Sequence, residues 1–117
     1  MSGPEDTVEA ETGDDPDRLL HTMQNALVSV FFSLPHQPNL TLRQLAVLLV
    51  VYLNDERQTV RGLAGRLNVP KYVVFRAIDR LVEMGLARQV TDIRSRRGVT
   101  VCRTVEGAAL VRRLKAI

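Results

Sequence analysis

Three arginines in the stretch DIRSRRGVTV, residues 92–101, are the residues best placed to do chemistry. Arg94, Arg96 and Arg97 fall within four consecutive positions. A guanidinium presents a planar fork of donors that matches the oxygens of phosphates and carboxylates, and neighbouring guanidiniums repel one another unless an anion or water faces them. The stretch therefore indicates a site for a negatively charged partner. The alternative is a hydrated turn in which Asp92 holds one of the arginines.

The other reactive side chains form no catalytic or metal-binding pattern. His21 and His36 have no carboxylate or cysteine partner at ligand spacing, and the sequence has no HExxH motif, CxxC pair or phosphate-binding glycine loop. The single cysteine, Cys102, is expected to behave as a small hydrophobic residue, with a redox-sensing thiol as the alternative. We therefore expect no enzyme, no metal site and no cofactor.

Charge is divided unevenly along the chain. Residues 1–17 hold seven acidic residues and no lysine or arginine, whereas the remainder holds all 16 basic residues against six acids, a net charge of +10. The basic part is expected to attract polyanions, and the acidic part has too little apolar content to fold alone. We expect a disordered tail over residues 1–17 and one folded domain over residues 18–117. The tail either only solubilises the protein or lies over the basic face and competes with the polyanion.

Signals for a membrane or an extracellular location are not found in the sequence. No apolar run approaches the roughly 20 residues of a transmembrane helix. The first residues lack the basic start and the apolar stretch of a signal peptide. These features, together with the single cysteine, predict a reduced, cytoplasmic protein that makes no contact with a membrane.

The spacing of apolar residues predicts four helices ahead of the arginine stretch. The first covers residues 18–34 and carries an apolar stripe wider than one contact surface requires. The second begins at Thr41 with the spacing of a capping box and is apolar on nearly all sides, as expected of a buried helix. Thr59 is expected to cap a short third helix, and Pro70 opens a fourth that Gly85 ends.

Beyond the fourth helix the apolar period changes from 3.6 to 2, which predicts two antiparallel strands joined by the arginine stretch. Thr104 is then expected to cap a final helix. Two short helices joined by a tight turn and followed by a hairpin form a winged helix-turn-helix. The predicted fold class is therefore α+β, mainly helical, with a two-stranded β-hairpin wing.

The fourth helix is the candidate recognition helix, because the second helix of such a pair normally enters the major groove of DNA. Its inward stripe is predicted to consist of Val74, Ala77, Ile78 and Leu81. The opposite face carries cationic and aromatic side chains that can reach phosphates, guanine edges or thymine methyls, namely Lys71, Tyr72, Phe75, Arg76 and Arg80. We expect this face to bind double-stranded DNA. The alternative is an ordinary solvated helix face.

Several segments, in order and spacing, resemble the MarR family of bacterial transcriptional regulators. They are LTLRQLAVL, TVRGLAGRLNV, VFRAIDRLVEMGL and DIRSRRGVTV through TVEG, and the resemblance covers about residues 40–114. It implies a homodimer on a pseudo-palindromic operator, a repressor rather than an activator, with recognition helices in the major groove and wings in the minor groove. By position it assigns DNA contacts to Lys71, Tyr72, Phe75, Arg76 and Arg80, and minor-groove insertion to the wing residues Arg94, Ser95, Arg96 and Arg97.

Three features depart from the family pattern. Ser95 stands where an acid usually precedes the paired wing arginines, so a freer and more cationic wing tip is expected. Arg103 stands at a strand position that is usually apolar, and we expect either a burial problem or a partner such as Glu106. Family members generally continue into a long C-terminal helix that builds the dimer, whereas this sequence ends at Ile117.

The N-terminal helix is the expected substitute for that dimer interface. Its broad stripe and the last helix are predicted to pair across a two-fold axis through Leu27, Val28, Phe31, Phe32, Leu110 and Leu114. The alternative is that Phe32 only fills the core of its own domain. A second functional class also stays open, an adaptor that docks another protein through Tyr72 and Phe75. The sequence assigns no small-molecule effector.

Overall fold

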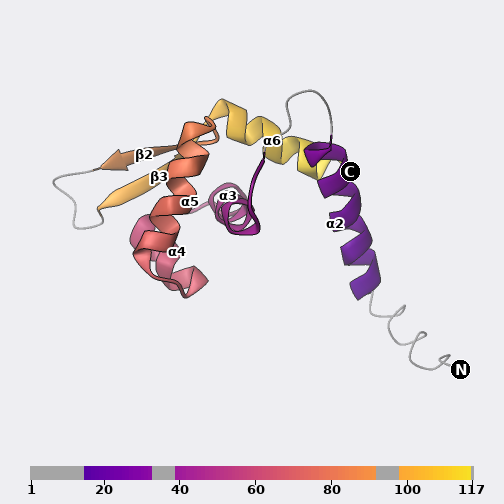
Figure 1. Ribbon diagram of the computed structural model, residues 1–117, viewed down its shortest axis with the longest axis horizontal. Helices are drawn as coiled ribbons and strands as arrows, with labels where there is room; N and C mark the ends of the chain where they lie inside the picture. The colour runs from indigo at the N-terminus through magenta and orange to yellow at the C-terminus, as the bar shows by residue number, and fades with distance from the viewer. Residues whose placement is uncertain (1–14, 33–38, 92–97, 117) are drawn as a thin grey trace, which may run out of the picture. The chain divides into compact units, whose positions relative to one another are not determined.

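The computed structural model describes residues 15–32, 39–91 and 98–116 (Figure 1). Contacts divide the chain into two units. The first comprises Met1–Gln37 with Arg113–Ile117, and the second comprises Pro38–Arg112. The predicted winged helix-turn-helix lies in the second unit, and the predicted N-terminal helix lies in the first.

The buried helix of the second unit is α3 (Leu42–Leu53). The Gln44 backbone N–H donates to Thr41 Oγ1 at 3.1 Å, and the Thr41 backbone N–H donates to Gln44 Oε1 at 2.9 Å. Each side chain thus satisfies a backbone donor that the first turn leaves unpaired, which completes the predicted capping box. Leu48 is fully buried, whereas Leu42 and Leu53 at the two ends are exposed.

The first helix of the helix-turn-helix is α4 (Val60–Leu67). Thr59 caps it as predicted, because its Oγ1 accepts a hydrogen bond from the Gly62 backbone N–H at 2.9 Å. Asn68 ends the helix in the left-handed region with φ 56°, a conformation that asparagine adopts more readily than most residues. This residue turns the chain toward the next helix.

The second helix of the pair is α5 (Lys71–Glu83), which starts directly after Pro70 and stops before Gly85 at φ 75°. Proline suits a helix start because it has no N–H to leave unpaired, and glycine suits the stop because it has no Cβ to clash at positive φ. The predicted inward stripe is confirmed, since its four members are buried: Val74, Ala77, Ile78 and Leu81.

The wing is an antiparallel hairpin of β2 (Ala87–Thr91) and β3 (Val99–Arg103), with Arg88 opposite Cys102. A short third strand, β1 (Gln58–Thr59), pairs with the other edge of β3, so the strand order is β1-β3-β2. The sequence predicted only the two-stranded hairpin, because two residues are too few to produce an alternating pattern. In Figure 1 the hairpin extends away from the end of α5.

The Tyr52 hydroxyl connects α3 to the start of β2 and to the end of β3. It donates to the Leu86 carbonyl oxygen at 2.7 Å and accepts from the Thr104 backbone N–H at 2.9 Å. The next helix, α6 (Val105–Lys115), approaches so closely that a Cβ on Gly107 would overlap this hydroxyl. Thr104 caps α6 as predicted, with its Oγ1 accepting from the Gly107 N–H at 3.0 Å.

In the first unit, α2 (Pro16–Phe31) begins earlier than predicted, because Asp15 caps it by accepting from the Asp17 backbone N–H at 3.0 Å. Phe32 is its C-cap, and residues 33 and 34, which the prediction included in the helix, lie outside the described residues. Several large apolar side chains of this segment are exposed: Leu19, Leu20, Met23, Val28 and Phe32. Within the described ranges, no helix has the length and apolar character needed to cross a membrane.

Candidate nucleic-acid interface

The outward face of α5 carries the predicted recognition residues. Lys71, Arg76 and Arg80 are exposed, and Tyr72 is 63% exposed. Phe75 differs from the prediction, because it is half-buried rather than facing fully outward. It lies next to buried Val74 and three residues before buried Ile78 on the same helix, so its ring sits at the border of the inward stripe.

Both acidic side chains in the C-terminal half of α5 have partners. Arg80 Nη1 lies 3.2 Å from Glu83 Oε2, an exposed pair one turn apart. Such surface ion pairs contribute about 0–1 kcal/mol, so a stronger anion can displace Glu83. Asp79 Oδ1 accepts from Gln89 Nε2 at 2.8 Å, which ties α5 to β2. The acids of α5 therefore do not neutralise its N-terminal half.

The N-terminal half of α5 keeps its cations available. Lys71 and Arg76 form no ion pair with any residue in the described part of the chain. Tyr72 stands between them in the sequence with its ring in solvent. The face therefore offers two cations and one amphipathic ring, which together can contact phosphate oxygens and base edges.

Arg43 joins this face from α3, and sequence reasoning missed it. Together with Thr41 and Gln44 it lines a hollow of about 270 Å³ whose opposite wall includes Tyr72 and Arg76. Two guanidiniums and a phenol beside one hollow can donate several hydrogen bonds to a phosphate. A signal was present in the sequence, because a cation in the first turn of a helix opposes the helix dipole and therefore suggests a role other than helix stability.

The wing tip falls outside the described residues. This applies to Arg94, Ser95, Arg96 and Arg97, whose assigned contacts stay predictions. The structure does describe the strands on either side of them, where Thr91 pairs with Val99. Gly98, at φ 73°, precedes β3 in a conformation that favours glycine.

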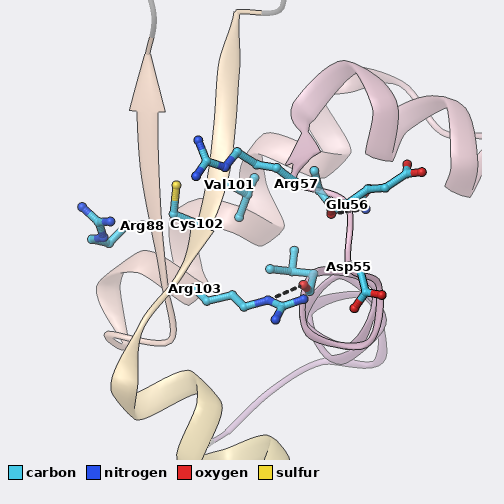
Figure 2. Close-up of a pocket in the computed structure, with 9 residues that line it drawn as sticks. Asp55, Glu56, Arg57, Arg88, Val101, Cys102 and Arg103 are labelled. Carbon is cyan, nitrogen blue, oxygen red and sulfur yellow. Dashed lines mark hydrogen bonds between the residues drawn. The ribbon is translucent and has the colours of Figure 1, made fainter.

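Arg103 has a different partner from the one expected. Its Nε donates to the Val51 carbonyl at 3.0 Å and its Nη2 to the Asn54 carbonyl at 2.6 Å. Figure 2 shows the side chain reaching from β3 to the end of α3. The expectation of a burial problem or a Glu106 partner was wrong, because Arg103 is exposed and the carboxyl end of α3, which has no basic residue in its last turn, lies within its reach.

The face of the sheet beside Arg103 forms a hollow of about 320 Å³, which is shown in Figure 2. Arg57 and Arg88 contribute to its lining together with Cys102. Cys102 is a free, half-buried thiol opposite Arg88 in the hairpin. Arg57 and Arg88 form no ion pair within residues 15–32, 39–91 and 98–116. The lining also includes Asp55 and Glu56, so basic and acidic side chains share this hollow.

The residues assigned to the dimer interface differ widely in exposure. Val28 is exposed and Phe32 is 72% exposed. Three others are half-buried, namely Leu27, Phe31 and Leu114. Leu110 is only 5% exposed in the single chain. The exposed members are Val28 of α2 and Phe32, its C-cap.

Comparison with protein families shows which family contains the segment from α3 to the wing. A model of the MarR family matches residues 39–98, just over half of the chain. The chain belongs to the MarR family. The match begins just before α3 and includes α4, α5 and β2, so it covers the whole helix-turn-helix.

Several solved structures have a similar fold. The transcriptional regulator Tm0710 from Thermotoga maritima aligns with a TM-score of 0.69 at 18% identity, over 97% of this chain and 71% of that one. Protein RV1404 from Mycobacterium tuberculosis aligns with a TM-score of 0.67 at 22% identity, over 95% and 71%. A MarR-family transcriptional regulator from Rhodococcus sp. RHA1 aligns with a TM-score of 0.61 at 24% identity, over 99% and 74%. No curated protein matches the chain significantly.

Membership of the MarR family gives the broad functional class. The family consists of transcriptional regulators, so the chain is a regulator of the DNA-binding type. The predicted winged helix fold is confirmed, and so is the resemblance from which the DNA contacts were assigned.

Proposed function

We propose that the protein binds double-stranded DNA sequence-specifically as a homodimer and represses transcription. In this proposal α5 enters the major groove and the wing enters the minor groove. The observation that carries it is the division of charge along α5. Within the described residues, Lys71 and Arg76 lie without an ion pair in the N-terminal half, whereas Glu83 pairs with Arg80 in the C-terminal half. In a helix-turn-helix the N-terminal residues of the second helix are the ones that contact base edges.

Each side chain has a role that follows from its chemistry. Lys71 and Arg76 bind phosphates or guanine edges, and the ring of Tyr72 contacts a thymine methyl or the sugar backbone. Arg43 binds a backbone phosphate beside Arg76, since both line one hollow. Phe75 makes a smaller contribution because it is half-buried.

The wing arginines Arg94, Arg96 and Arg97 enter the minor groove, with Ser95 between them. Narrow A·T-rich minor grooves have an enhanced negative potential that attracts arginine. This contact therefore reads groove shape, whereas α5 reads base edges. Arg80 completes the interface from the C-terminal half of α5, where a phosphate can displace Glu83 from its exposed ion pair.

The dimer forms through the exposed apolar residues of α2 and its C-cap, among them Val28 and Phe32. Two copies related by a two-fold axis present their α5 helices to half-sites about one helical turn apart. Repression needs only occupancy of the promoter, whereas activation also needs a productive contact with polymerase. Because the target is genomic DNA in a bacterial type of regulator, the protein acts in the cytoplasm.

The contact assignment is tested with a duplex of about 30 base pairs, long enough for two half-sites, selected by the protein from fragmented genomic DNA. Lys71→Ala and Arg76→Ala should each lower affinity about tenfold and reduce the magnitude of the salt slope by about one for each phosphate that is no longer neutralised. Arg112→Ala, which removes an exposed arginine on α6, is the matched control and should leave both quantities unchanged. Equal effects of all three substitutions would contradict the assignment.

A protein-docking adaptor is the second candidate, and one observation favours it. A hollow of about 180 Å³ between α3 and α5 is lined mainly by apolar side chains, among them Ala46, Val47, Leu67 and Val73. An apolar hollow of this kind can accept a side chain of another protein. The adaptor hypothesis predicts no duplex binding even at low salt, which is the outcome that distinguishes it from DNA binding.

A further inference from the structure

Two consecutive residues at the base of the wing are bound to the last turn of α3. Arg103 donates from Nε to the Val51 carbonyl at 3.0 Å and from Nη2 to the Asn54 carbonyl at 2.6 Å. Its guanidinium carbon also lies 5.6 Å from the centre of the Tyr52 ring, within the range of a cation–π contact. The next residue, Thr104, donates its backbone N–H to the Tyr52 hydroxyl at 2.9 Å. The end of β3 is thus held at several points by one helical turn.

The other strand of the wing, β2, starts beside the same turn of α3. The Leu86 carbonyl, directly before β2, accepts from the Tyr52 hydroxyl at 2.7 Å. Further along β2, Gln89 donates to Asp79 of α5 at 2.8 Å. The hairpin is therefore attached at its base to α3 and on one side to the recognition helix. We call the contacts of Arg103 with the end of α3, and of Tyr52 with Leu86 and Thr104, the wing-base clamp.

Arginine suits this position better than lysine or leucine. The last turn of α3 contains no basic residue, and its free carbonyls carry the negative end of the helix dipole. A guanidinium can donate to two carbonyls at once while its flat face lies over an aromatic ring. Lysine keeps the charge but loses the fixed fork, and leucine loses both.

Because the clamp lies at the base of the hairpin, a small rotation there moves the far end of the wing by a larger distance. Each strand contributes five residues, so at about 3.4 Å per residue the far end of the hairpin lies about 17 Å from its base. A rotation of about 10° at the base moves the far end by about 3 Å, which is the length of a hydrogen bond. A small change at Arg103 is therefore enough to remove a wing contact with DNA.

We propose that Arg103 is a positioning residue, which fixes the angle of the wing relative to α5 by binding the carboxyl end of α3. Arg103 itself does not touch DNA in this proposal. It acts through the wing arginines, so the inference rests on the proposed DNA binding. Since the clamp joins the wing to α3, any shift of the last turn of α3 is passed directly to the wing.

Binding to the selected duplex tests the coupling with a double-mutant cycle. Arg103→Leu should lower affinity about tenfold, and Arg103→Lys should recover part of that loss. In an Arg96→Ala background, where the wing's hold on DNA is already weakened, Arg103→Leu should lower affinity by no more than about twofold, because both substitutions remove the same interaction. A full tenfold loss in both backgrounds, or no loss in either, would overturn the proposal.

A second measurement reports the wing angle without DNA. Spin labels are placed at Val90 on β2 and Arg66 on α4, both exposed, in a Cys102→Ala background that removes the native thiol. The distance distribution between the labels should broaden at least about twofold with Arg103→Leu and by less with Arg103→Lys. An unchanged distribution would show that Arg103 does not set the angle. Broadening in a protein that binds no duplex would support the clamp and reject DNA binding as the function.

Discussion

Replacing Tyr52 with phenylalanine removes a single oxygen from the centre of the second unit. That oxygen is the meeting point of three segments, because it donates to Leu86 before β2 and accepts from Thr104 before α6. The residue is only 8% exposed, so water does not readily replace the missing partner. The ring itself is retained, and with it the packing and the contact with the Arg103 guanidinium.

The expected loss of stability follows from the two groups left behind. The Leu86 carbonyl and the Thr104 N–H each lose a hydrogen bond at a site of low solvent access. A buried polar group without a partner costs about 1–3 kcal/mol. Because both groups are affected and partial relaxation is possible, we expect Tyr52→Phe to lower the free energy of unfolding by about 2–3 kcal/mol. For a domain of this size the corresponding fall in Tm is about 10 °C.

Urea denaturation followed by circular dichroism measures this change. The m-value should stay unchanged, since the same surface is exposed on unfolding. Tyr72→Phe is the matched control, because Tyr72 is 63% exposed and its substitution should change the free energy of unfolding by less than about 0.5 kcal/mol. If Tyr52→Phe were as mild as Tyr72→Phe, the hydroxyl would not hold the hairpin and α6 together.

Three further predictions follow from the backbone and surface geometry. Gly107→Ala should lower the free energy of unfolding by more than about 2 kcal/mol, because its Cβ would overlap the Tyr52 hydroxyl. In Gly65→Ala the new Cβ meets nothing within 4 Å, so this substitution should raise the free energy of unfolding by about 0.5–1 kcal/mol. Equal effects of the two substitutions in urea denaturation would contradict this. Asn68→Gly should be nearly neutral and Asn68→Val should cost about 1–2 kcal/mol in thermal unfolding, because Asn68 lies at φ 56°. Phe32→Asp should shift sedimentation from dimer to monomer without loss of folding, and a retained dimer would exclude α2 as the interface.

Local signals in the sequence were enough to predict the helix-turn-helix. The caps at Thr41, Thr59 and Thr104 each depend on residues within three positions, and each was found as expected. The start and stop of α5 at Pro70 and Gly85 depend on the backbone preferences of single residues. The buried stripe of α5 follows from helical periodicity alone. These features do not require knowledge of the rest of the fold.

Contacts between distant parts of the sequence could not be predicted in the same way. The partners of Arg103 are Val51 and Asn54, 52 and 49 residues away, whereas sequence spacing suggested a nearby acid such as Glu106. Likewise, β1 is a strand only because its two residues meet β3. Arg43 joins Tyr72 and Arg76 only because α3 and α5 pack together. In each case the decisive partner is supplied by tertiary structure.

The half-buried ring of Phe75 shows a limit of helical periodicity. A helical wheel assigns each residue to one face, but a large ring at the border of the buried stripe can lie partly under its neighbours. The assignment of Phe75 to the outward face was therefore correct in direction and too strong in degree. Lys71 and Arg76, which lie further from the stripe, are exposed as expected.

The salt dependence of duplex binding by the unmodified chain tests the central claim most directly. Affinity for the selected duplex is measured between about 50 and 200 mM salt, and its logarithm is plotted against the logarithm of salt concentration. A dimer that neutralises about six or more phosphates predicts a slope of about −5 or steeper. A flat response, or no binding at the lowest salt, would contradict the proposal that this basic winged helix is a DNA-binding regulator.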